Sequence, residues 1–384
     1  MANRVAIVGV GQTHHTAHRP DVNQVELMNE AVRAALRDAD LSIKDVDAFL
    51  MGNMELFEGS YLVDMWAVDG IGSYMKPGAK ITSGGTTGAS LAIAAFEYAA
   101  SGLFDIVLAV GFEKQEEGNT QAGIVAGSDP LWGRWIFTSS LGIFARTALE
   151  YMRRTGAREE HAAMLRVKAD RCACRNPYAH LKLNLTMEDV LNSRMLVYPL
   201  RFLDMCPVSN GACALIVASE AVARRISDKP VWVADWVTVH DLEGSLMGAM
   251  PDVRTHEIAA AELYKRNQIT DVRRDIDVAE IYEPSSWGEL EWYELYHFCE
   301  RGEAWKLAEK GTTDMEGEFP VNPSGGVVST NPIGATAMIR IAEAALQVRG
   351  DAGTHQVTRE VRTALATGWG GSDWTTMVLL KKSL

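Results

Sequence analysis

The segment ITSGGTTGASLAIAAFEYAASG, residues 81–102, joins a glycine-rich turn to an alanine-rich helix. In a strand-to-helix turn of this kind, the N–H groups at the start of the helix favour negative charge, as a reactive centre requires. The segment nevertheless contains no strong nucleophile, because the hydroxyls of Thr86 and Thr87 are weak nucleophiles without an adjacent base. The segment indicates the fold, whereas the chemistry has to be inferred together with residues elsewhere in the chain.

Strand and helix patterns alternate around this turn. Short apolar runs predict strands, and apolar residues spaced three or four apart predict helices. The predicted elements are a strand at 4–10, a helix at 25–40, a strand at 48–54, a helix at 88–101 and a strand at 105–111. This alternation is typical of an α/β fold with a mostly parallel sheet covered by helices.

The C-terminal part repeats the pattern. Its predicted elements are a strand at 231–239, a helix at 253–267, a strand at 278–282, helices at 290–298 and 335–347, and strands at 361–366 and 375–380. Residues 325–350 again lead a small-residue turn into an alanine-rich helix. We therefore predict a duplicated chain in which two helix N-termini meet near the middle. The N-terminal half spans 1–112 and is completed by about 204–225, and the C-terminal half spans 226–384.

Residues 113–203 are predicted to form an inserted, mainly helical cap, with helices at 144–154, 159–172 and 187–192. The cap is rich in basic residues, in contrast to the acidic chain as a whole. These residues could receive the phosphate groups of a ligand, although a solvated helical surface explains each of them as well. They are Arg166, Lys168, Arg171, Arg175, Lys182, Arg194 and Arg201.

The composition argues against several classes of partner. A formal net charge of −13 disfavours nucleic acid and anionic membranes, which require a basic surface. The most apolar window, 91–108, carries Glu97 and Asp105, and residues 1–13 lack the long apolar stretch of a secretory signal. We therefore predict no membrane contact and a cytoplasmic location. The five cysteines are an odd number without the spacing of a structural zinc site, so reduced thiols and no metal are expected in this chain.

Seven motifs in order resemble the thiolase superfamily, in particular the branch of sterol-carrier-protein thiolases and archaeal acyl-CoA thiolases. Besides the turn at 81–102 and the strand after it, they are GVGQT (9–13), RNPYAHLK with PLRFLDMCPVSNGACALIVAS (175–219), DVAEIYEP (277–284), CERGEAWKLAEKG (299–311), FPVNPSGGVVSTNPIGATA (319–337) and GWGGSDW (368–374). The resemblance covers essentially the whole chain. It implies the thiolase fold, with duplicated αβαβα halves in a five-layered core, dimerisation through sheet edges, and a coenzyme A thioester bound where the halves meet.

The resemblance also shows which residues of covalent chemistry are replaced. The nucleophilic cysteine of the family's turn aligns with Gly85, the histidine of its Gly-His-Pro motif with Asn331, and a second cysteine falls near Gly368. An asparagine can donate a hydrogen bond to a thioester oxygen, but it cannot shuttle a proton as imidazole does. A cycle through an acyl-cysteine is therefore not expected.

Polarising and proton-transfer groups are retained. Tyr282 and Glu283 stand at the family's His-Asp motif and are the expected acid–base groups, with Asn331 as a hydrogen-bond donor. Backbone N–H groups at Gly85, Gly370 and Gly371 are expected to bind an enolate or thioester oxygen. Glycine at these positions would otherwise serve only the close packing of strand and helix.

Coenzyme A, as substrate or product, is expected beside these groups. Thr86 follows the position of the missing cysteine, and Met250 and Pro251 belong to the segment GAMPD, which resembles the family's segment beside the pantetheine. Cys206 is the cysteine that stands in a motif; we interpret it as a buried, inert thiol in preference to a displaced nucleophile.

Three functions remain open. The first is retro-Claisen cleavage of a β-oxoacyl-CoA by free coenzyme A. Residues 51–59, 84–88 and 129–135 resemble the large subunits of benzoylsuccinyl-CoA thiolases of anaerobic toluene degradation, which would imply cleavage to benzoyl-CoA and succinyl-CoA. The second is retro-aldol cleavage of a β-hydroxyacyl-CoA, as in similar thiolase-like aldolases that also carry a glycine turn and a tyrosine. The third is a non-catalytic scaffold subunit that binds coenzyme A, against which Tyr282 and Glu283 argue.

The resemblance further implies a homodimer that works with a small zinc-ribbon/OB-fold subunit. An aromatic-rich part of the C-terminal half would add to such an interface if it were exposed, although aromatic residues at helical spacing are more typical of a core. These residues are Trp287, Trp292, Tyr293, Tyr296 and Trp305.

Overall fold

The computed structural model describes residues 3–131, 133–136, 139–241, 254–371 and 374–384. Within these ranges, nine strands form one mixed sheet with the order β3-β2-β4-β7-β1-β8-β11-β10-β9. The predicted mostly parallel sheet is wrong, because five of the eight strand pairs are antiparallel. The strands are β1 (Val5–Gln12), β2 (Ala48–Gly52), β3 (Gly78–Lys80), β4 (Ile106–Lys114), β7 (Asn210–Ser219), β8 (Val231–His240), β9 (Val278–Glu280), β10 (Thr363–Gly370) and β11 (Trp374–Lys381).

The pairing of the strands confirms the predicted duplication. Strand β2 pairs with β4 in parallel, as β9 does with β10. Strand β4 pairs with β7 in an antiparallel manner, as β10 does with β11, and β7 lies beside β1 as β11 lies beside β8. The two halves join at β1, which also pairs with β8 through Ala6–Trp232 and Ile7–Val231. The N-terminal strand therefore lies in the middle of the sheet.

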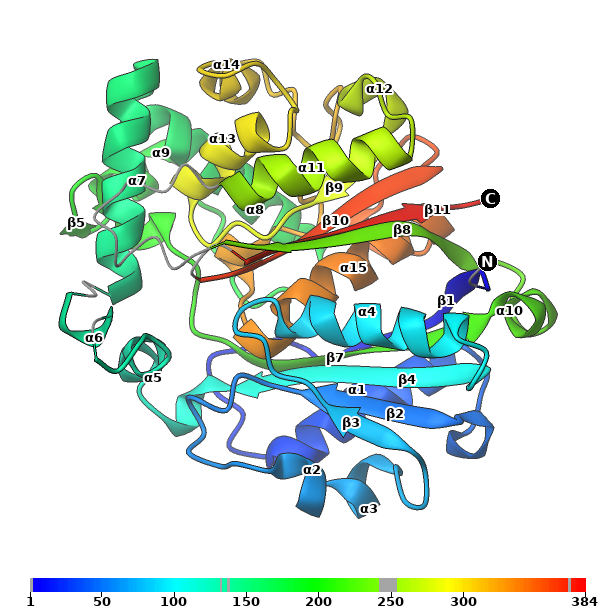
Figure 1. Ribbon diagram of the computed structural model, residues 1–384. Helices are drawn as coiled ribbons and strands as arrows, with labels where there is room; N and C mark the ends of the chain where they lie inside the picture. The colour runs from blue at the N-terminus through cyan, green and yellow to red at the C-terminus, as the bar shows by residue number, and fades with distance from the viewer. Residues whose placement is uncertain (1–2, 132, 137–138, 242–253, 372–373) are drawn as a thin grey trace.

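Helices α4 (Thr87–Ala100) and α15 (Ile333–Arg349) form the middle layer, between the strands of the two halves (Figure 1). Every residue of α15 from Ile333 to Val348 is buried, as expected of a helix covered on all sides. The two helices approach closely at Gly88, where a side chain would overlap the backbone of Met338. Gly88 therefore allows α4 and α15, the two helices that follow glycine turns, to contact each other at the centre of the molecule.

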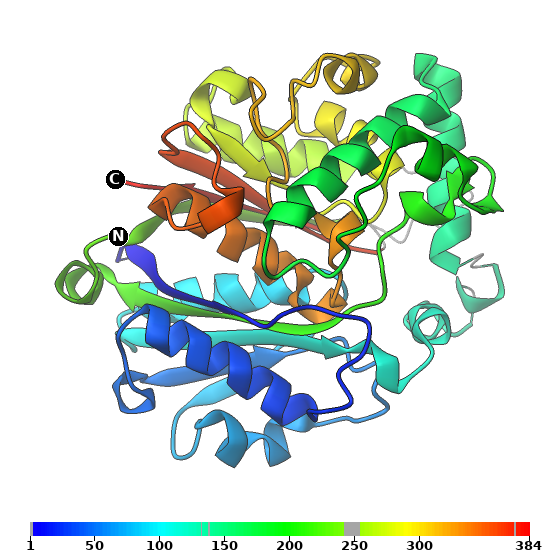
Figure 2. The ribbon, with the colours of Figure 1, turned by 180° about the vertical axis from the view of Figure 1, so that it is seen from behind.

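Helices α1 (Gln24–Asp38) and α11 (Arg254–Arg266) form the outer layers. Helix α1 buries the stripe of Leu27, Met28, Ala31, Val32 and Ala35 against the outer face of the N-terminal strands, and Figure 2 shows it from that side. With the two sheet portions and the middle helices, these layers give the expected five-layered αβαβα arrangement (Figure 1).

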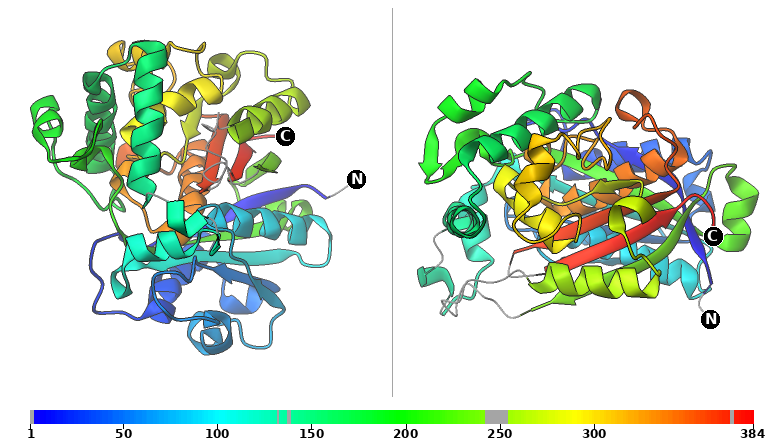
Figure 3. Two further views of the ribbon diagram at one scale, coloured as in Figure 1. Left: turned by 60° about the vertical axis from the view of Figure 1, so that its left-hand side comes forward. Right: turned by 90° about the horizontal axis from the view of Figure 1, so that it is seen from above.

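The segment between β4 and β7 is mainly helical, as predicted. It contains α5 (Thr120–Ala126), α6 (Gly133–Ile136), α7 (Ser139–Thr155), α8 (Glu159–Arg175), α9 (Met187–Asn192) and the strand pair β5 (Met195–Val197) and β6 (Leu200–Arg201). Figure 3 shows these elements gathered at one end of the body formed by the two halves, and Figures 1 and 2 show both termini at the opposite end. The boundaries at 113 and 203 stay a prediction.

Further short helices complete the described chain, and none of the described helices has the length and apolar character needed to cross a bilayer. They are α2 (Val63–Trp66), α3 (Val68–Ile71), α10 (Glu220–Ile226), α12 (Val272–Asp275), α13 (Ser286–Leu295) and α14 (Ala304–Glu309). Helix α13 starts four residues earlier than expected because the Ser285 side chain caps it by accepting a hydrogen bond from the Gly288 N–H.

Strand β9 ends at Glu280, two residues before the predicted end. The backbone N–H of Ile281 donates to the side-chain oxygen Oδ1 of Asn322 at 2.7 Å, and that of Tyr282 donates to Oγ1 of Thr367 at 2.9 Å. At these two residues, side chains of Asn322 and Thr367 accept the backbone hydrogen bonds that a neighbouring strand would otherwise accept. Tyr282 consequently lies on the loop that leaves the sheet, where α/β sheets collect ligands.

Candidate active site

The glycine turn is held by its own side chains. Thr86 Oγ1 donates to the carbonyl oxygen of Ser83 at 2.6 Å, and Thr87 Oγ1 donates to that of Gly84 at 2.7 Å. Gly84 has a φ of +60°, which favours glycine. The Thr86 side chain is fully buried in this turn and does not line the cavity described below, so its expected contact with coenzyme A stays a prediction.

Gly85, which the family resemblance aligns with a cysteine, has no room for a side chain. A Cβ at this residue would overlap the carbonyl oxygen of Trp369 on β10 and would lie 3.3 Å from both the Tyr282 hydroxyl and the Cα of Gly370. Only glycine therefore fits unless β10 moves. The turn also lies close to the end of β10, since a Cβ at Gly370 would lie 3.3 Å from the amide nitrogen of Thr86 and 3.4 Å from that of Gly85.

Tyr282 presents its hydroxyl to this crowded point. Its side chain is 3% exposed, and its ring lies beside Trp369 with the ring centroids 6.4 Å apart. Burial raises the pKa of the Tyr282 hydroxyl far above its ordinary value, and a hydrogen bond with Thr336 opposes this shift only in part. The hydroxyl is therefore protonated at neutral pH and can donate a hydrogen bond or a proton.

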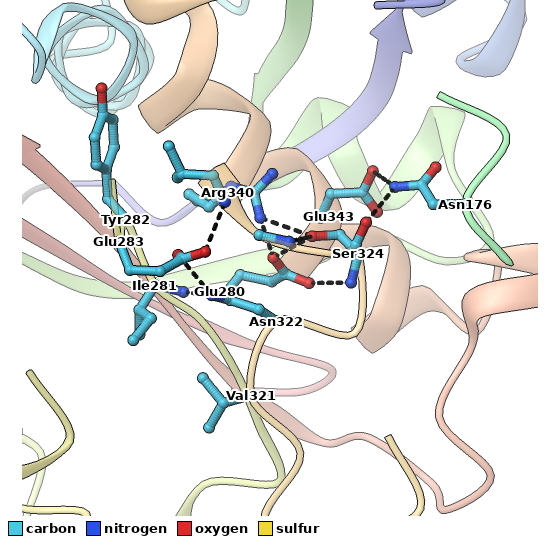
Figure 4. A network of polar contacts seen from close by, with 12 residues as sticks. Asn176, Glu280, Ile281, Tyr282, Glu283, Val321, Asn322, Ser324, Arg340 and Glu343 are labelled. Atoms are coloured by element: carbon cyan, nitrogen blue, oxygen red, sulfur yellow. Dashed lines mark hydrogen bonds and ion pairs between the residues drawn. The ribbon is translucent and has the colours of Figure 1, made fainter. Parts of the chain in front are cut away.

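Glu283 follows Tyr282 in the sequence, but its carboxyl group points into the protein interior, away from the Tyr282 hydroxyl (Figure 4). Its Oε1 accepts a hydrogen bond from the backbone N–H of Val327 at 2.8 Å, and its Oε2 accepts one from Asn322 Nδ2 at 2.6 Å. Burial raises the pKa of this carboxyl to about 8, with a further contribution from Glu289. These two hydrogen bonds hold the loop that precedes α15. Glu283 is not among the described residues that line the cavity.

Asn331 and Cys206 form a hydrogen-bonded pair on the wall of the cavity described below. Asn331 Nδ2 donates to the Cys206 sulfur at 3.2 Å, while Asn331 Oδ1 accepts from Thr336 Oγ1 at 2.9 Å. Burial raises the pKa of the Cys206 thiol to about 12, so the reactive thiolate is scarce at neutral pH. Cys206 is partly buried and borders the cavity, in contrast to the buried thiol expected from its motif.

These residues border a cavity of about 1,020 Å³ between the two glycine turns and the inserted helices. Gly85, Gly371, Tyr282 and Asn331 line it, whereas Gly370 forms the strand end behind it. The remaining wall is largely apolar and includes Met54, Phe144, Leu181, Phe202 and Ile333. A cavity of this size accommodates a substantial organic ligand such as an acyl-pantetheine arm. Met250 and Pro251 lie outside the described residues.

A few polar side chains interrupt this apolar wall. Arg146, Arg166 and Arg194 come from the inserted helices and the loop after α9. His180 Nδ1 lies 2.8 Å from the Ser209 hydroxyl, and burial lowers the pKa of His180 to about 4, so its imidazole is neutral. Sequence reasoning considered Arg166 and Arg194 only as part of a basic cap and missed His180 and Arg146, because helical patterns do not show which side chains face a cavity.

The expected aromatic interface is not present in the C-terminal half. Trp287, Trp292, Tyr293 and Tyr296 are each at most 3% exposed, and Trp305 packs partly buried against the same core. They fill the core between α13 and the rest of the half, as residues at helical spacing commonly do. A partner subunit would therefore have to bind elsewhere.

Comparison with known protein families and curated proteins finds relatives over nearly the whole chain. Residues 243–382 match the family model described as thiolase C-terminal domain-like. An acetyl-CoA acetyltransferase from Methanothermobacter thermautotrophicus is 31% identical over 363 residues, which are 92% of this chain and 93% of that protein. The benzoylsuccinyl-CoA thiolase subunit BbsB from Thauera aromatica is 28% identical over 383 residues, which are 97% of this chain and 96% of that protein.

Among solved structures, the Ltp2-ChsH2(DUF35) aldolase superposes with a TM-score of 0.84 over 100% of this chain and 99% of the matched chain. The two sequences are 24% identical. At that level of identity, the likeness concerns the fold.

Proposed function

The chain belongs to the thiolase superfamily, and from that premise we propose that it is an enzyme that breaks a carbon–carbon bond of an acyl-CoA without an acyl-cysteine intermediate. The carrying observation is the crowded surroundings of Gly85, where the backbone of Trp369 occupies the space that a nucleophilic side chain would need. The raised pKa of the partly buried Cys206 thiol supports the same conclusion, because a thiol with a raised pKa is seldom ionised at neutral pH and is a weak nucleophile.

Retro-aldol cleavage of a β-hydroxyacyl-CoA is the reaction that these residues support best. In this reaction the β-hydroxyl loses its proton, the bond between the α- and β-carbons breaks, and its electron pair forms the enolate of the shorter acyl-CoA. Protonation of the α-carbon then completes the shorter thioester, and the other product is an aldehyde or ketone. No acyl group is carried by the enzyme, so the lack of a nucleophile at Gly85 is no obstacle.

Each step has a candidate group. The backbone N–H groups of Gly85, near the start of α4, and of Gly371 both border the cavity and would stabilise the enolate oxygen. The Tyr282 hydroxyl would pass a proton from the β-hydroxyl toward the α-carbon. Because burial disfavours a free tyrosinate, donation and acceptance at Tyr282 would have to occur together. Asn331 would orient the ligand from the opposite wall.

Retro-Claisen cleavage of a β-oxoacyl-CoA is the second candidate. The match to the benzoylsuccinyl-CoA thiolase subunit BbsB over 97% of this chain favours it, and benzoylsuccinyl-CoA would then be the substrate to try first. With Gly85 in place of a cysteine, free coenzyme A would have to attack the ketone directly. Tyr282 would protonate the enolate that leaves. A purely scaffolding role is disfavoured by this tyrosine at the cavity.

Coenzyme A consumption distinguishes the two reactions. The full chain, alone and with a candidate small subunit, is incubated with a β-hydroxyacyl-CoA or the matching β-oxoacyl-CoA, and products are measured by mass spectrometry with and without free coenzyme A. Retro-aldol cleavage predicts a carbonyl product from the hydroxy substrate without consumption of coenzyme A. One coenzyme A consumed per β-oxoacyl-CoA cleaved would establish the retro-Claisen reaction instead.

Intact-mass measurement after rapid quenching tests the shared premise. We expect no acyl adduct on the chain and retained turnover in Cys206→Ala. A kinetically competent acyl adduct at Cys206 would overturn the proposed reaction without a covalent intermediate.

A further inference from the structure

Arg166 lies on the cavity wall and has no role in the proposed cleavage. It belongs to α8, and its side chain is 0% exposed. Its Nε, Nη1 and Nη2 atoms have no hydrogen-bond partner among the described residues. A buried charge is unfavourable unless it is paired, so an unsatisfied guanidinium at a cavity indicates that a partner is supplied by a ligand.

Other basic residues near Arg166 in the chain or in the core form ion pairs with carboxylates. Lys168, two residues further along α8, forms an ion pair with Glu289. The buried Arg340 on α15 lies 2.6 Å from a carboxylate oxygen of Glu280. Three further arginines of the insert also pair with carboxylates: Arg171 with Asp314, Arg175 with Glu316 and Arg201 with Glu159. Arg166 differs from these five paired basic residues in that no described carboxylate accepts a hydrogen bond from its guanidinium.

The two carboxylates with the largest electrostatic effect on Arg166 already accept hydrogen bonds from other groups. Asp170 accepts hydrogen bonds from the backbone N–H groups of Leu183 at 2.9 Å and Leu185 at 2.8 Å. Asp204 accepts hydrogen bonds from the Ser286 hydroxyl at 2.7 Å and from the backbone N–H of Arg201 at 2.8 Å. Both act on Arg166 through their charge, but neither receives a hydrogen bond from its guanidinium.

We propose that Arg166 binds a free carboxylate on the acyl group, so that the substrate is the coenzyme A thioester of a dicarboxylic acid. The planar guanidinium presents paired N–H groups that match the two oxygens of a carboxylate. The inference rests on the proposed function for the identity of the ligand as an acyl-CoA, and it adds the chemical class of the acyl group.

A phosphate of coenzyme A is the other anion that could reach the cavity. Arg166 is completely buried on the wall of the cavity that Gly85 and Tyr282 also line, which favours a contact with the acyl group. Arg194 is exposed on the same cavity, with its guanidinium 5.9 Å from the centre of the Phe202 ring, and it is better placed for a solvated phosphate. The proposal therefore assigns the carboxylate to Arg166.

Binding of three probes to the full chain tests the assignment: succinyl-CoA, butyryl-CoA and coenzyme A. The two thioesters share a four-carbon acyl chain and differ in the terminal carboxylate. Isothermal titration calorimetry should show that the unaltered chain binds succinyl-CoA at least tenfold more tightly than butyryl-CoA. Equal affinity for these two thioesters, or no binding of any probe, would overturn the proposal without recourse to a variant.

The substitution Arg166→Gln separates the two anion sources. We expect it to remove the preference for succinyl-CoA while leaving the affinities for butyryl-CoA and coenzyme A within about twofold. An equal loss for all three probes would assign Arg166 to a phosphate and refute the carboxylate site. Arg194→Gln is the matched control and should keep the preference for succinyl-CoA.

The outcome is distinguishable from failure of the proposed function. A preference for succinyl-CoA without any carbon–carbon cleavage would support the carboxylate site and refute the reaction. Cleavage of neutral β-hydroxyacyl-CoA with no preference for succinyl-CoA would support the reaction and refute the site. Thermal unfolding of the ligand-free Arg166→Gln variant confirms that it is folded, and we expect no loss of melting temperature because an unpaired buried charge is removed.

Discussion

Tyr282 is the residue on which the proposed reaction depends most directly. Its hydroxyl faces Gly85, and burial keeps it protonated. Tyr282→Phe should lower turnover by about a hundredfold, the scale of a lost acid–base group, without a change in melting temperature. The buried Tyr296 does not line the cavity, so Tyr296→Phe is the control. Unchanged kinetics in Tyr282→Phe would exclude this residue from the mechanism.

Restoring a cysteine at Gly85 should not restore a thiolase cycle. A side chain there would overlap the Trp369 carbonyl oxygen, and forced overpacking costs about 1–3 kcal/mol. We expect Gly85→Cys to have a lower melting temperature and to form no acyl adduct. Gly371→Ala is the matched control for stability, because a Cβ there meets no atom within 4 Å. An acylated and fully stable Gly85→Cys would contradict the proposed crowding.

Glu283 makes stability depend on pH. Burial raises its pKa from 4.5 to about 8, so the folded chain holds a proton that the unfolded chain releases. The free energy of unfolding should therefore fall as the pH rises through this interval, by about 2 kcal/mol between pH 6 and pH 8 from this residue. Urea unfolding at the two pH values should show a smaller decline in Glu283→Gln. The exposed Glu188→Gln serves as the control, and an equal decline in all three proteins would rule out Glu283 as the source.

At the scale of single elements, much of the fold could be predicted because it depends on local pattern. The strand at 48–54 and the helices at 88–101, 159–172 and 187–192 lie close to the observed β2, α4, α8 and α9. The ends that were wrong depend on distant residues: β10 runs to Gly370, not to the predicted Ala366, because it pairs with β11 up to Trp374. No local pattern contains that information.

The residues of the candidate site could also be predicted in part from the sequence. Gly85, Tyr282 and Asn331, which the family resemblance pointed to, line one cavity, and their roles there stay predictions. The resemblance did not anticipate that the side chains of Tyr282 and Glu283 would separate, because Asn322 and Val327, from a distant loop, engage the Glu283 carboxyl. The unpaired state of Arg166 could not be predicted either, since a sequence does not show which basic side chains find a partner.

The edge strand β3 is the element that we expect to form the homodimer. Among the described strands it pairs with β2 alone, which leaves its other edge free. An exposed apolar group precedes it in the chain: Tyr61, Leu62, Met65, Trp66, Tyr74 and Met75. Unpaired edges and apolar patches of this kind mark association surfaces. Met65→Glu with Met75→Glu should shift the chain toward a monomer in light scattering, whereas the exposed Leu103→Glu should not; an unaltered dimer in the double variant would place the interface elsewhere.

At the scale of the whole molecule, the proposed assembly includes a small zinc-ribbon/OB-fold subunit. The family resemblance implies that zinc found in the complex should reside in this partner. Expressed alone, the chain should dimerise but show weak turnover, and co-expression with the small subunit should restore it. Elemental analysis and activity of each preparation provide the test. Full turnover by the purified chain, free of zinc and of any second polypeptide, would refute this assembly.

The central place of β1 affects how the protein is made on the ribosome. Residues 5–12 are synthesised about 200 residues before their sheet neighbours at 210–219 and 231–240. At synthesis rates of ~5–20 residues per second, this apolar strand waits on the order of 10–40 s for its first neighbour. Until then, both of its edges are open to other chains. We therefore expect the strand order to favour chaperone binding to the nascent chain, independently of how stable the finished protein is.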